Sequence, residues 1–412
     1  MDRSPGLVAI TGIGIVSPFG RGLSALSSGL LGCRSCLAPL SIFDAGLDSR
    51  PTVAEIRELP NVGERANFRL SRTDHLAVLA ALDTAKAAGE CSDFLESGAI
   101  IATTVGGLSD IDPLIVSNPA HYYRDGGFAN VTSYSSSHPA DAVGAWLGLR
   151  GPCWGVSVAC ASGAMAIALA AGMVIAGDAP MMLAGGSDAL AAYTLSGFNS
   201  LQALDPSPCR PFDKNRKGLN LGEGAAVFLL ETLDHARARN APILAILRGW
   251  AMTNDAFHQT APDEQGRGLA DSISSAVAMA GVTADAVGYV NAHGTGTLLN
   301  DVAEVKAYET AFQSRRSPIP VSSTKSYFGH CLGAAGALEA AVTIVSMRSA
   351  TLFPTLRLSD PIESSAIDWL RGEPRRQPIP VGMTVSAGFG GSNTSLIFEL
   401  PHDELPDDSD RV

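Results

Sequence analysis

The chain has 412 residues, of which 46% are hydrophobic and 17% charged, so it has ample apolar material for one large core or several domains. Its formal net charge of −12 argues against nucleic-acid binding, because a nucleic-acid interface needs a basic surface. The N-terminus lacks the basic start and apolar stretch of a signal peptide, and no Gly-free apolar run is long enough to predict a membrane span. Seven cysteines without framework spacing favour a reducing compartment, so we expect a cytoplasmic protein.

Strand-like and helix-like segments alternate from the N-terminus onward. The first series has strands over 6–18, 97–107, 154–159, 180–190 and 222–233, and helices over 74–89, 141–149 and 162–177. A second series begins near Ala241, with strands over 241–254, 286–294 and 319–326, helices over 268–281, 300–312 and 333–347, and a closing hairpin over 383–400.

This alternation predicts an α/β fold in which sheets are covered on both faces. The two series have a similar order, which indicates an internal duplication with two sheets stacked around shared central helices. We expect residues 1–240 to form one half, residues 241–400 to form the other, and residues 401–412 to be an acidic, flexible tail.

Cys160 lies where the strand pattern "WGVSVA" gives way to "SGAMAIALAAGMVIAG". The second segment has no polar stripe and predicts a helix that is buried on all sides. The thiol would then occupy a sharp turn at a helix N-terminus, whose unpaired N–H groups and partial positive charge favour a thiolate nucleophile. The alternative is a cysteine that serves only as a small core residue.

Two histidines also follow predicted strands, where α/β sheets commonly place their sites. His293 lies in "VNAHGTGT" and His330 in "STKSYFGHCLGAAG". A Cys–His pair is a standard route to an activated sulfur nucleophile. Lys325 and Glu339 could form a buried pair that fixes the histidine tautomers, or a surface ion pair. The Gly-rich turn over 388–393 lets backbone N–H groups approach a ligand closely.

Two other motifs carry little weight. Cys33 and Cys36 form a CxxC pattern, but no second pair or histidine follows at ligand spacing, so we expect no metal site. The segment "TGIGIVSPFG" has its third glycine in the wrong place for a dinucleotide-binding loop, and no helix pattern starts there.

Five separated motifs resemble, in order, those of the β-ketoacyl-acyl carrier protein synthase family of elongating KAS I/II type. They are "ACASG", "GEGAAVFLLE", "YVNAHGTGT", "SSTKSYFGHCLGAAGALEA" and "GFGGSN", and the resemblance covers nearly the whole chain. It implies a thiolase-like fold with duplicated α/β halves in a five-layer α-β-α-β-α arrangement. It also implies a 3-oxoacyl-[acyl-carrier-protein] synthase that condenses an acyl group on Cys160 with malonyl-ACP in fatty acid biosynthesis.

The resemblance further implies roles for residues at the matching positions. Cys160 would accept the acyl group, and its N–H would form an oxyanion hole with the N–H of Phe389, which is also the gate. His293 and His330 would be the catalytic histidines, supported by Lys325 and Glu339. The remaining implied positions are Thr295 and Thr297 for the pantetheine arm, Asp301 and Glu304 behind the site, and Val105, Phe198 and Ala387 in the acyl pocket.

The implied partner is an acyl carrier protein that delivers substrates on phosphopantetheine, so we expect no separate cofactor. Acyl carrier proteins are acidic, and a chain of net charge −12 then needs a local basic landing surface. Two clusters could provide it or could simply be solvated: Arg65, Arg69 and Arg72, and Arg210, Lys214, Arg216 and Lys217. We expect a homodimer with sheets paired across a two-fold axis, or a heterodimer with a related ketosynthase-like chain.

Three positions depart from the usual elongating pattern. Ala387 replaces an aromatic residue before the gate, "ASGAM" follows the nucleophile position, and Gln202 stands where a basic carrier-contacting residue is often found. Ala387 and Val105 indicate a roomier or differently shaped acyl pocket. A dedicated polyketide, polyene or unusual-lipid pathway is therefore an alternative.

Three other protein classes are less well supported. A degradative thiolase would have a second cysteine in the closing motif, where this chain has "GFGGSN". A scaffold partner that does not elongate would have lost Cys160, and a hydrolase or simple acyltransferase would not need both His293 and His330.

Overall fold

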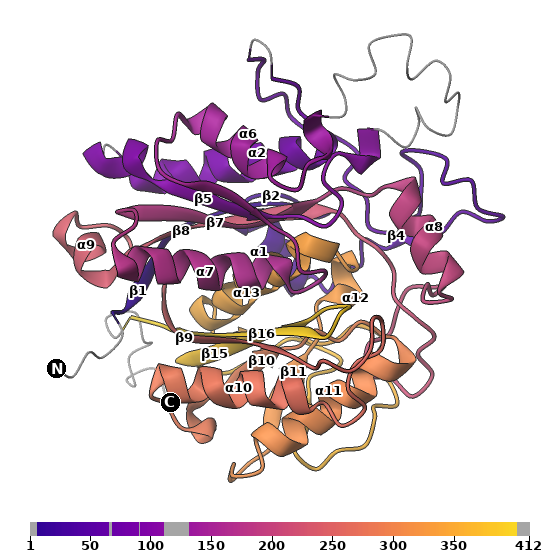
Figure 1. Cartoon of the computed structure of the whole chain (residues 1–412). Helices are drawn as coiled ribbons and strands as arrows, with labels where there is room; N and C mark the ends of the chain where they lie inside the picture. Colours follow the sequence, from indigo (N-terminus) through magenta and orange to yellow (C-terminus); the bar gives the residue numbers. More distant parts are fainter. Residues whose placement is uncertain (1–5, 66–67, 90, 111–131, 402–412) are drawn as a thin grey trace.

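The computed structural model describes residues 6–65, 68–89, 91–110 and 132–401. Five layers are visible in Figure 1, alternating between helices and sheets. The outer helices are α2 (Arg72–Ala85) and α6 (His138–Leu147) on one side, and α10 (Arg267–Ala280) and α11 (Leu298–Ala311) on the other. Between the sheets lie α7 (Ser162–Ala176) and α13 (Ala335–Arg348). The expected five-layer arrangement is confirmed.

The two sheets have the same strand order. The first runs β1 (Val8–Ser17), β8 (Gly224–Thr232), β7 (Met181–Asp188), β5 (Gly98–Ala102), β6 (Cys153–Val156). The second runs β9 (Ala245–Asn254), β16 (Ser392–Glu399), β15 (Val381–Ala387), β10 (Tyr289–Asn291), β11 (Ile319–Ser322) and ends on β13 (Ile367–Trp369). In both, two antiparallel pairings precede two parallel ones, which is the pattern of a duplicated unit, and β13 adds a third parallel pairing to the second sheet.

A short seam joins the two sheets. The chain leaves the first sheet through β8 and α9 (Leu233–Ala238) and enters the second at β9. Only Val8, Ala9 and Ile10 of β1 pair with β9, in antiparallel register. The two halves therefore share a continuous ladder at one point and otherwise meet through the central helices.

The central helices α7 and α13 consist mostly of small apolar residues. Residues 335–347 of α13 are all buried, and Glu339 is the single ionisable residue among them. The segment Ala159–Ala176, which includes α7, is long and apolar enough to cross a membrane by length and composition, yet most of it is buried between the two sheets. The absence of a polar stripe in both helices follows from contact with sheets on either side.

The remaining elements are short or peripheral. They are β2 (Gly20–Arg21), α1 (Leu23–Leu31), β3 (Ala38–Pro39), β4 (Thr52–Val53), α8 (Ala192–Ser200), α12 (Lys325–Phe328), β12 (Thr351–Leu352) and β14 (Arg375–Arg376). Single 3-10 turns are formed by Lys86–Ala88, Ser92–Glu96, Thr132–Tyr134, Ala284–Ala286 and Leu332–Ala334.

Candidate active site

The turn between β6 and α7 carries Cys160, as the sequence predicts. Ala159 has a positive φ of 50°, a backbone conformation that non-glycine residues rarely adopt. Ser162 holds the turn from the first residue of the helix, because its hydroxyl accepts from Val158 N at 2.8 Å and donates to Ala159 O at 2.5 Å. Cys160 is only 8% exposed and lines a cavity. A strained turn that persists because its surroundings determine it is typical of a functional site.

The cavity beside Cys160 has a volume of about 300 Å³. It joins the two halves of the chain, because the cysteine comes from the first half and most of the other polar side chains come from the second. Among the predicted site residues, its lining includes Cys160, His293, His330, Thr295, Thr297, Ala387 and Phe389.

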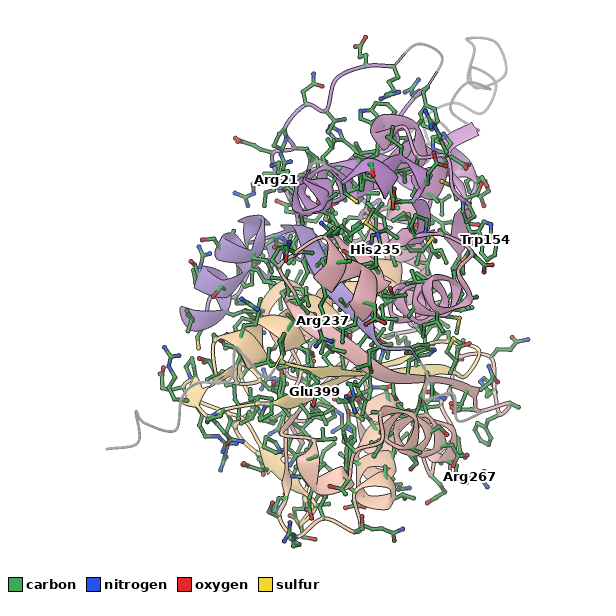
Figure 2. All side chains as sticks on the ribbon, turned by 90° about the vertical axis from the view of Figure 1, so that its left-hand side faces the viewer. Arg21, Trp154, His235, Arg237, Arg267 and Glu399 are labelled. Carbon is green, nitrogen blue, oxygen red and sulfur yellow. The ribbon has the colours of Figure 1, made fainter. Side chains whose placement is uncertain are left out.

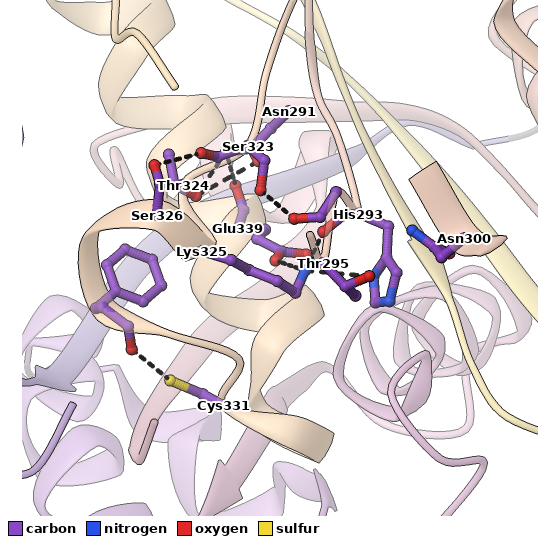
Figure 3. Close-up of polar contacts among 12 residues, drawn as sticks. Asn291, His293, Thr295, Asn300, Ser323, Thr324, Lys325, Ser326, Cys331 and Glu339 are labelled. Carbon is purple, nitrogen blue, oxygen red and sulfur yellow. Dashed lines mark hydrogen bonds and ion pairs between the residues drawn. The ribbon is translucent and has the colours of Figure 1, made fainter. Parts of the chain in front are cut away.

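His293 follows β10 and is held through both its backbone and its ring. Lys325 Nζ donates to His293 O at 2.5 Å, lies 3.3 Å from His293 Nδ1 and pairs with Glu339, as Figure 3 shows. An ammonium group has no acceptor, so Nδ1 must be the unprotonated nitrogen if it engages Lys325. His293 then carries its proton on Nε2.

His330 is fixed mainly by its backbone. Its N–H donates to Asn220 O at 2.7 Å, and its carbonyl accepts from Gly222 N at 3.0 Å. The centroids of the His293 and His330 rings lie 5.3 Å apart, with the ring planes at 86° to each other. Among the described residues, none gives the buried Nδ1 of His330 a hydrogen-bond partner.

Both histidines are neutral at physiological pH. Burial lowers the pKa of His293 and of His330 well below the usual value, and the positive charge of Lys325 lowers both further. A neutral imidazole carries one N–H group, which can donate a hydrogen bond to an oxyanion that develops during the reaction.

The thiol of Cys160 is protonated in the resting structure. Burial raises its pKa to about 12, while the charge of Lys325 and a hydrogen bond from the Phe389 N–H act in the opposite direction. This shift runs against the resting thiolate expected at the helix N-terminus, because the effect of removal from water exceeds that of the stabilising groups. The proton has to leave as the sulfur attacks.

The turn over 388–393 brings Phe389 N–H to the sulfur. A Cβ at Gly388 would make tight contacts there, at 3.1 Å from Cys160 N and 3.2 Å from Ala161 N, so glycine suits the close approach of the two backbones. The Phe389 ring is 39% exposed and stacks on Phe198 of α8, with centroids 5.7 Å apart. This pair of rings covers one side of the cavity.

The three residues expected in the acyl pocket are placed differently from one another. Ala387 lines the cavity, and Phe198 is linked to it through the stacking on Phe389. Val105 does not line the cavity. It is buried in a neighbouring apolar cluster that also contains Leu195 and Leu332.

The two acidic residues of α11 organise the loop that carries His293. Glu304 accepts hydrogen bonds at 2.7 Å from the backbone N–H groups of His293 and Gly294. Asp301 accepts from Gly296 N at 3.1 Å, in the same loop as Thr295. Burial raises the pKa of Glu304 to about 7, and these hydrogen bonds counteract part of that rise.

Thr295 and Thr297 lie on the cavity wall, and their hydroxyl oxygens are 2.9 Å apart. They offer polar groups along the entrance to the cysteine.

Two of the residues expected to contact a carrier protein are committed to the fold, which corrects the expectation for them. Arg72 makes a two-point ion pair with buried Glu223, at 2.6 and 2.8 Å. Arg216 is 8% exposed and donates to the carbonyls of Thr297 and Leu298 at 3.0 and 2.8 Å. Charge clusters in a sequence do not reveal which members are buried.

The other basic residues remain at or near the surface. Lys214 pairs with Glu363 at 2.8 Å, and Arg65 lies over the ring of Trp146. Arg69 is exposed and Arg210 is partly buried. Lys217 is exposed and lines the cavity, so it stands at the entrance to the site.

An apolar rim at the entrance was not expected from the sequence. Leu201, Leu298 and Leu299 all line the cavity and are 51%, 61% and 62% exposed. Exposed leucines that border a cavity indicate a contact surface. In the sequence, only the pair "LL" directly after "HGTGT" could have indicated this rim. Whether these two leucines are exposed depends on the position of α11, which the sequence pattern does not give.

Family models match most of the chain. The beta-ketoacyl synthase N-terminal domain matches residues 7–236, and the C-terminal domain matches residues 244–359. The "3-oxoacyl-[acyl-carrier-protein] synthase 2" of Coxiella burnetii is 34% identical over 96% of this chain and 99% of that protein. Nodulation protein E of Rhizobium meliloti is 36% identical over 97% of this chain and 100% of that protein.

Solved structures show the same fold. The ishigamide ketosynthase/chain length factor has a TM-score of 0.87 and 28% identity, covering 96% of this chain and 100% of that one. A type II polyketide ketosynthase bound to the hexaketide, in complex with its acyl-carrier protein, has a TM-score of 0.85 and 25% identity over the same shares.

Proposed function

Because the chain belongs to the beta-ketoacyl synthase family, we propose that Cys160 forms the acyl-enzyme of a decarboxylative condensation. The protein is an acyltransferase-class condensing enzyme, a 3-oxoacyl-[acyl-carrier-protein] synthase that extends an acyl chain by two carbons in fatty acid biosynthesis. The observation that carries the residue assignment is the meeting of Cys160 with two neutral imidazoles in one cavity of about 300 Å³.

The first step transfers the acyl group to the cysteine. Cys160 Sγ attacks the carbonyl carbon of an acyl thioester, and the oxyanion is held by the N–H groups of Cys160 and Phe389. A neutral imidazole accepts the thiol proton, since burial disfavours a free thiolate. The bond to the pantetheine sulfur then breaks, and that sulfur leaves as a thiol with the proton.

The second step generates the carbon nucleophile. The thioester oxygen of malonyl-ACP accepts hydrogen bonds from the two imidazoles, and the bond to the carboxylate breaks to release CO₂. The electron pair remains as an enolate, whose negative oxygen is stabilised by donors in a dry cavity. The arrangement of Lys325 and His293 keeps His293 Nε2 as a donor.

The third step forms the carbon–carbon bond. The enolate carbon attacks the carbonyl of the acyl-Cys160 thioester, and the same oxyanion hole holds the tetrahedral intermediate. The bond to Cys160 sulfur breaks, the sulfur takes up a proton that comes from solvent, one for each CO₂ released, and a 3-oxoacyl thioester leaves. Two carbons have been added, and the thiol is regenerated.

The substrates arrive on an acyl carrier protein, as the named relatives suggest for this family. We propose that the carrier lands at the entrance formed by Leu201, Leu298 and Leu299, with Lys217 as the adjacent cation. Thr295 and Thr297 then face the pantetheine arm. No separate cofactor is required by these steps, and the cytoplasmic location remains a prediction.

The deciding experiment compares two activities in the Cys160→Ala variant. Wild-type protein, given acyl-ACP and malonyl-ACP, should release one CO₂ for each 3-oxoacyl-ACP formed. The variant should show no acyl adduct by intact mass and no condensation, yet still release CO₂ from malonyl-ACP because the histidines remain. Equal loss of both activities in a folded Cys160→Ala protein would refute this division of roles.

A second variant tests the histidine assignment. His293→Ala should lower decarboxylation by about 10²–10³-fold, the effect of losing one oxyanion donor. If wild-type Cys160 is acylated but no malonyl-dependent CO₂ appears, the protein is instead a hydrolase or a simple acyltransferase. A panel of acyl-ACPs of increasing length, with products identified by mass, separates fatty acid elongation from a dedicated polyketide or unusual-lipid pathway.

A further inference from the structure

Asp188 is a fully buried carboxylate that the steps above do not use. It is the last residue of β7 and is 0% exposed. In the described part of the chain, no basic side chain forms an ion pair with it, although five donors surround it. A buried charge without a cation is costly unless hydrogen bonds satisfy it.

Four of the donors come from the turn that follows β5. Thr104 N lies 3.0 Å from both carboxylate oxygens, Val105 N is at 2.9 Å, and the Thr104 hydroxyl is at 2.6 Å. The Thr103 hydroxyl is the fourth. It accepts from Gly106 N at 2.9 Å, which directs its own proton toward Asp188.

The fifth donor comes from the other half of the chain. Gly333 N donates to Asp188 Oδ2 at 2.6 Å. Gly333 lies three residues after His330, in the turn that leads into α13. One carboxylate therefore ties the turn at Val105 to the turn that carries His330.

Glycines allow the backbone segments to approach closely at this point. A Cβ on Gly333 would lie 2.8 Å from Asp188 Oδ2 and 2.9 Å from Thr104 N. A Cβ on Gly163, in the first turn of α7, would lie 2.7 Å from Gly333 O. The nucleophile helix and the histidine turn thus touch through backbone atoms, and the end of β7 reaches the histidine turn through the Asp188 carboxylate.

We propose that Asp188 is a positioning residue that fixes His330 relative to Cys160 and holds the turn at Val105, whose side chain packs in the apolar cluster next to the cavity. This role rests on the function proposed above. Through Gly333 it restrains the histidine turn against the first turn of α7. Through the backbone N–H of Val105 it restrains the apolar cluster that contains Leu195 and Leu332, next to the cavity.

The chemistry of the donors explains why an acid stands there. Three backbone N–H groups and two hydroxyls need lone pairs, and a carboxylate supplies only acceptors. In Asp188→Asn, one oxygen becomes an NH₂ group that faces N–H donors. An NH₂ group at Oδ1 leaves donors of residues 103–105 unsatisfied, and one at Oδ2 leaves donors of Thr104 and Gly333 unsatisfied.

The test compares Asp188→Asn with the control Glu231→Gln. Glu231 is an equally buried acid that accepts from Thr11, His235 and Arg239. It pairs with Met181, at the opposite end of β7 from Asp188. Both variants should lower the urea midpoint, but only Asp188→Asn should alter the site.

Asp188→Asn should retain acylation of Cys160 by short acyl-ACP within about threefold, because Ser162 still holds the cysteine turn. Condensation with malonyl-ACP should fall tenfold or more, since it needs Cys160 and His330 in register. The preference among acyl lengths should flatten. Hydrogen exchange should accelerate in peptides covering 103–107 and 330–335, and Glu231→Gln should change none of these four properties.

Thr104→Val is the milder variant if Asp188→Asn does not fold, since it removes one hydroxyl donor at nearly constant shape. It should shift the ratio of condensation to acylation in the same direction, by about threefold. Unchanged ratio, length preference and exchange in a folded Asp188→Asn would overturn the proposal. If wild-type protein fails to condense, the proposed function is refuted, while the exchange measurement still tests whether Asp188 holds the two turns.

Discussion

Burial moves the pKa values of the cavity residues in opposite directions, yet it leaves each group neutral. The pKa of the Cys160 thiol is raised, and the pKa values of both imidazoles are lowered. Charge therefore develops in the cavity only during the reaction, where fixed N–H donors meet it. Exclusion of water from the neutral groups beside the sulfur would protect an acyl-enzyme from hydrolysis.

The alkylation of Cys160 should depend steeply on pH. With a thiol pKa of about 12, the thiolate fraction grows tenfold per pH unit from pH 7 to pH 10, and the rate with iodoacetamide follows it without a plateau. Peptide mass analysis gives the rate at Cys160, and the Cys160→Ser variant gives the background from the other cysteines. A plateau between pH 7 and pH 9 would show that the resting sulfur is already ionised.

At the residue scale, the sequence predicted the reacting groups better than their environment. Cys160, His293 and His330 stand in motifs with fixed order, and all three line the cavity. The protonation of the thiol was not predictable, because burial arises from packing of the two halves. The same holds for Arg216, whose charge sits in a basic run but whose partners are carbonyls of the loop at Thr297.

At the scale of single elements, α7 shows how a glycine can determine packing. Gly163 faces the turn before α13, where a Cβ would approach Gly333 O to 2.7 Å and Ala337 N to 2.9 Å. Gly172 lies in the same helix, with no atom within 4 Å of the corresponding position. Both glycines have a helical backbone, so they differ only in the space available for an added Cβ atom.

The pair Gly163→Ala and Gly172→Ala should therefore have opposite effects. Gly163→Ala should lower the free energy of unfolding by about 1–3 kcal/mol, because backbone atoms have to move, and should reduce condensation. Gly172→Ala should raise it by about 0.4–1 kcal/mol, since only the unfolded chain loses freedom. Urea titration measures both; similar effects of the two substitutions would exclude the packing argument.

Periodicity predicted the long elements and missed the short ones. The strands of both sheets were predicted except the two-residue β2, which pairs with β1, and the three-residue β13, which precedes a segment that contains arginine, glycine and proline. The helices α1 and α8 were also missed, because their serine- and glycine-rich sequences carry a weak apolar pattern. Their position depends on contacts with the rest of the molecule rather than on local preference.

At the scale of the whole molecule, β6 ends the first sheet within the described part of the chain. Among those residues it pairs with β5 along one edge only, and Trp154 is 51% exposed. Figure 2 shows Trp154 at the periphery of the molecule. An unpaired strand edge with an exposed aromatic residue favours pairing with a second copy.

We expect a homodimer that forms through this edge. Sedimentation should give twice the 42.6 kDa of one chain at micromolar concentration. Trp154→Glu should shift the protein toward monomer, whereas Leu31→Glu should not. Leu31 is 44% exposed on α1, which packs near β1 and is separated from β6 by three strands. A stable wild-type monomer, or dissociation by both variants, would contradict a β6 interface.

The sequence predicted the duplication, because its strand and helix segments form two series of similar order. It did not predict which strands pair with each other. Strands β7 and β5 are neighbours although α6, β6 and α7 lie between them in the chain. The three-residue seam between β1 and β9 likewise joins segments far apart in sequence. Such contacts follow from tertiary packing, which local periodicity does not encode.

The position of α7 between two sheets has a consequence during synthesis. This helix ends at Ala176, and α13, which covers it from the other side, begins at Ala335. At about 5–20 residues per second, translation needs roughly 8–30 s to produce the intervening chain. Throughout that interval the face of α7 that later packs on α13 has no partner from the second half of the chain, although it carries no polar residues to keep it in water.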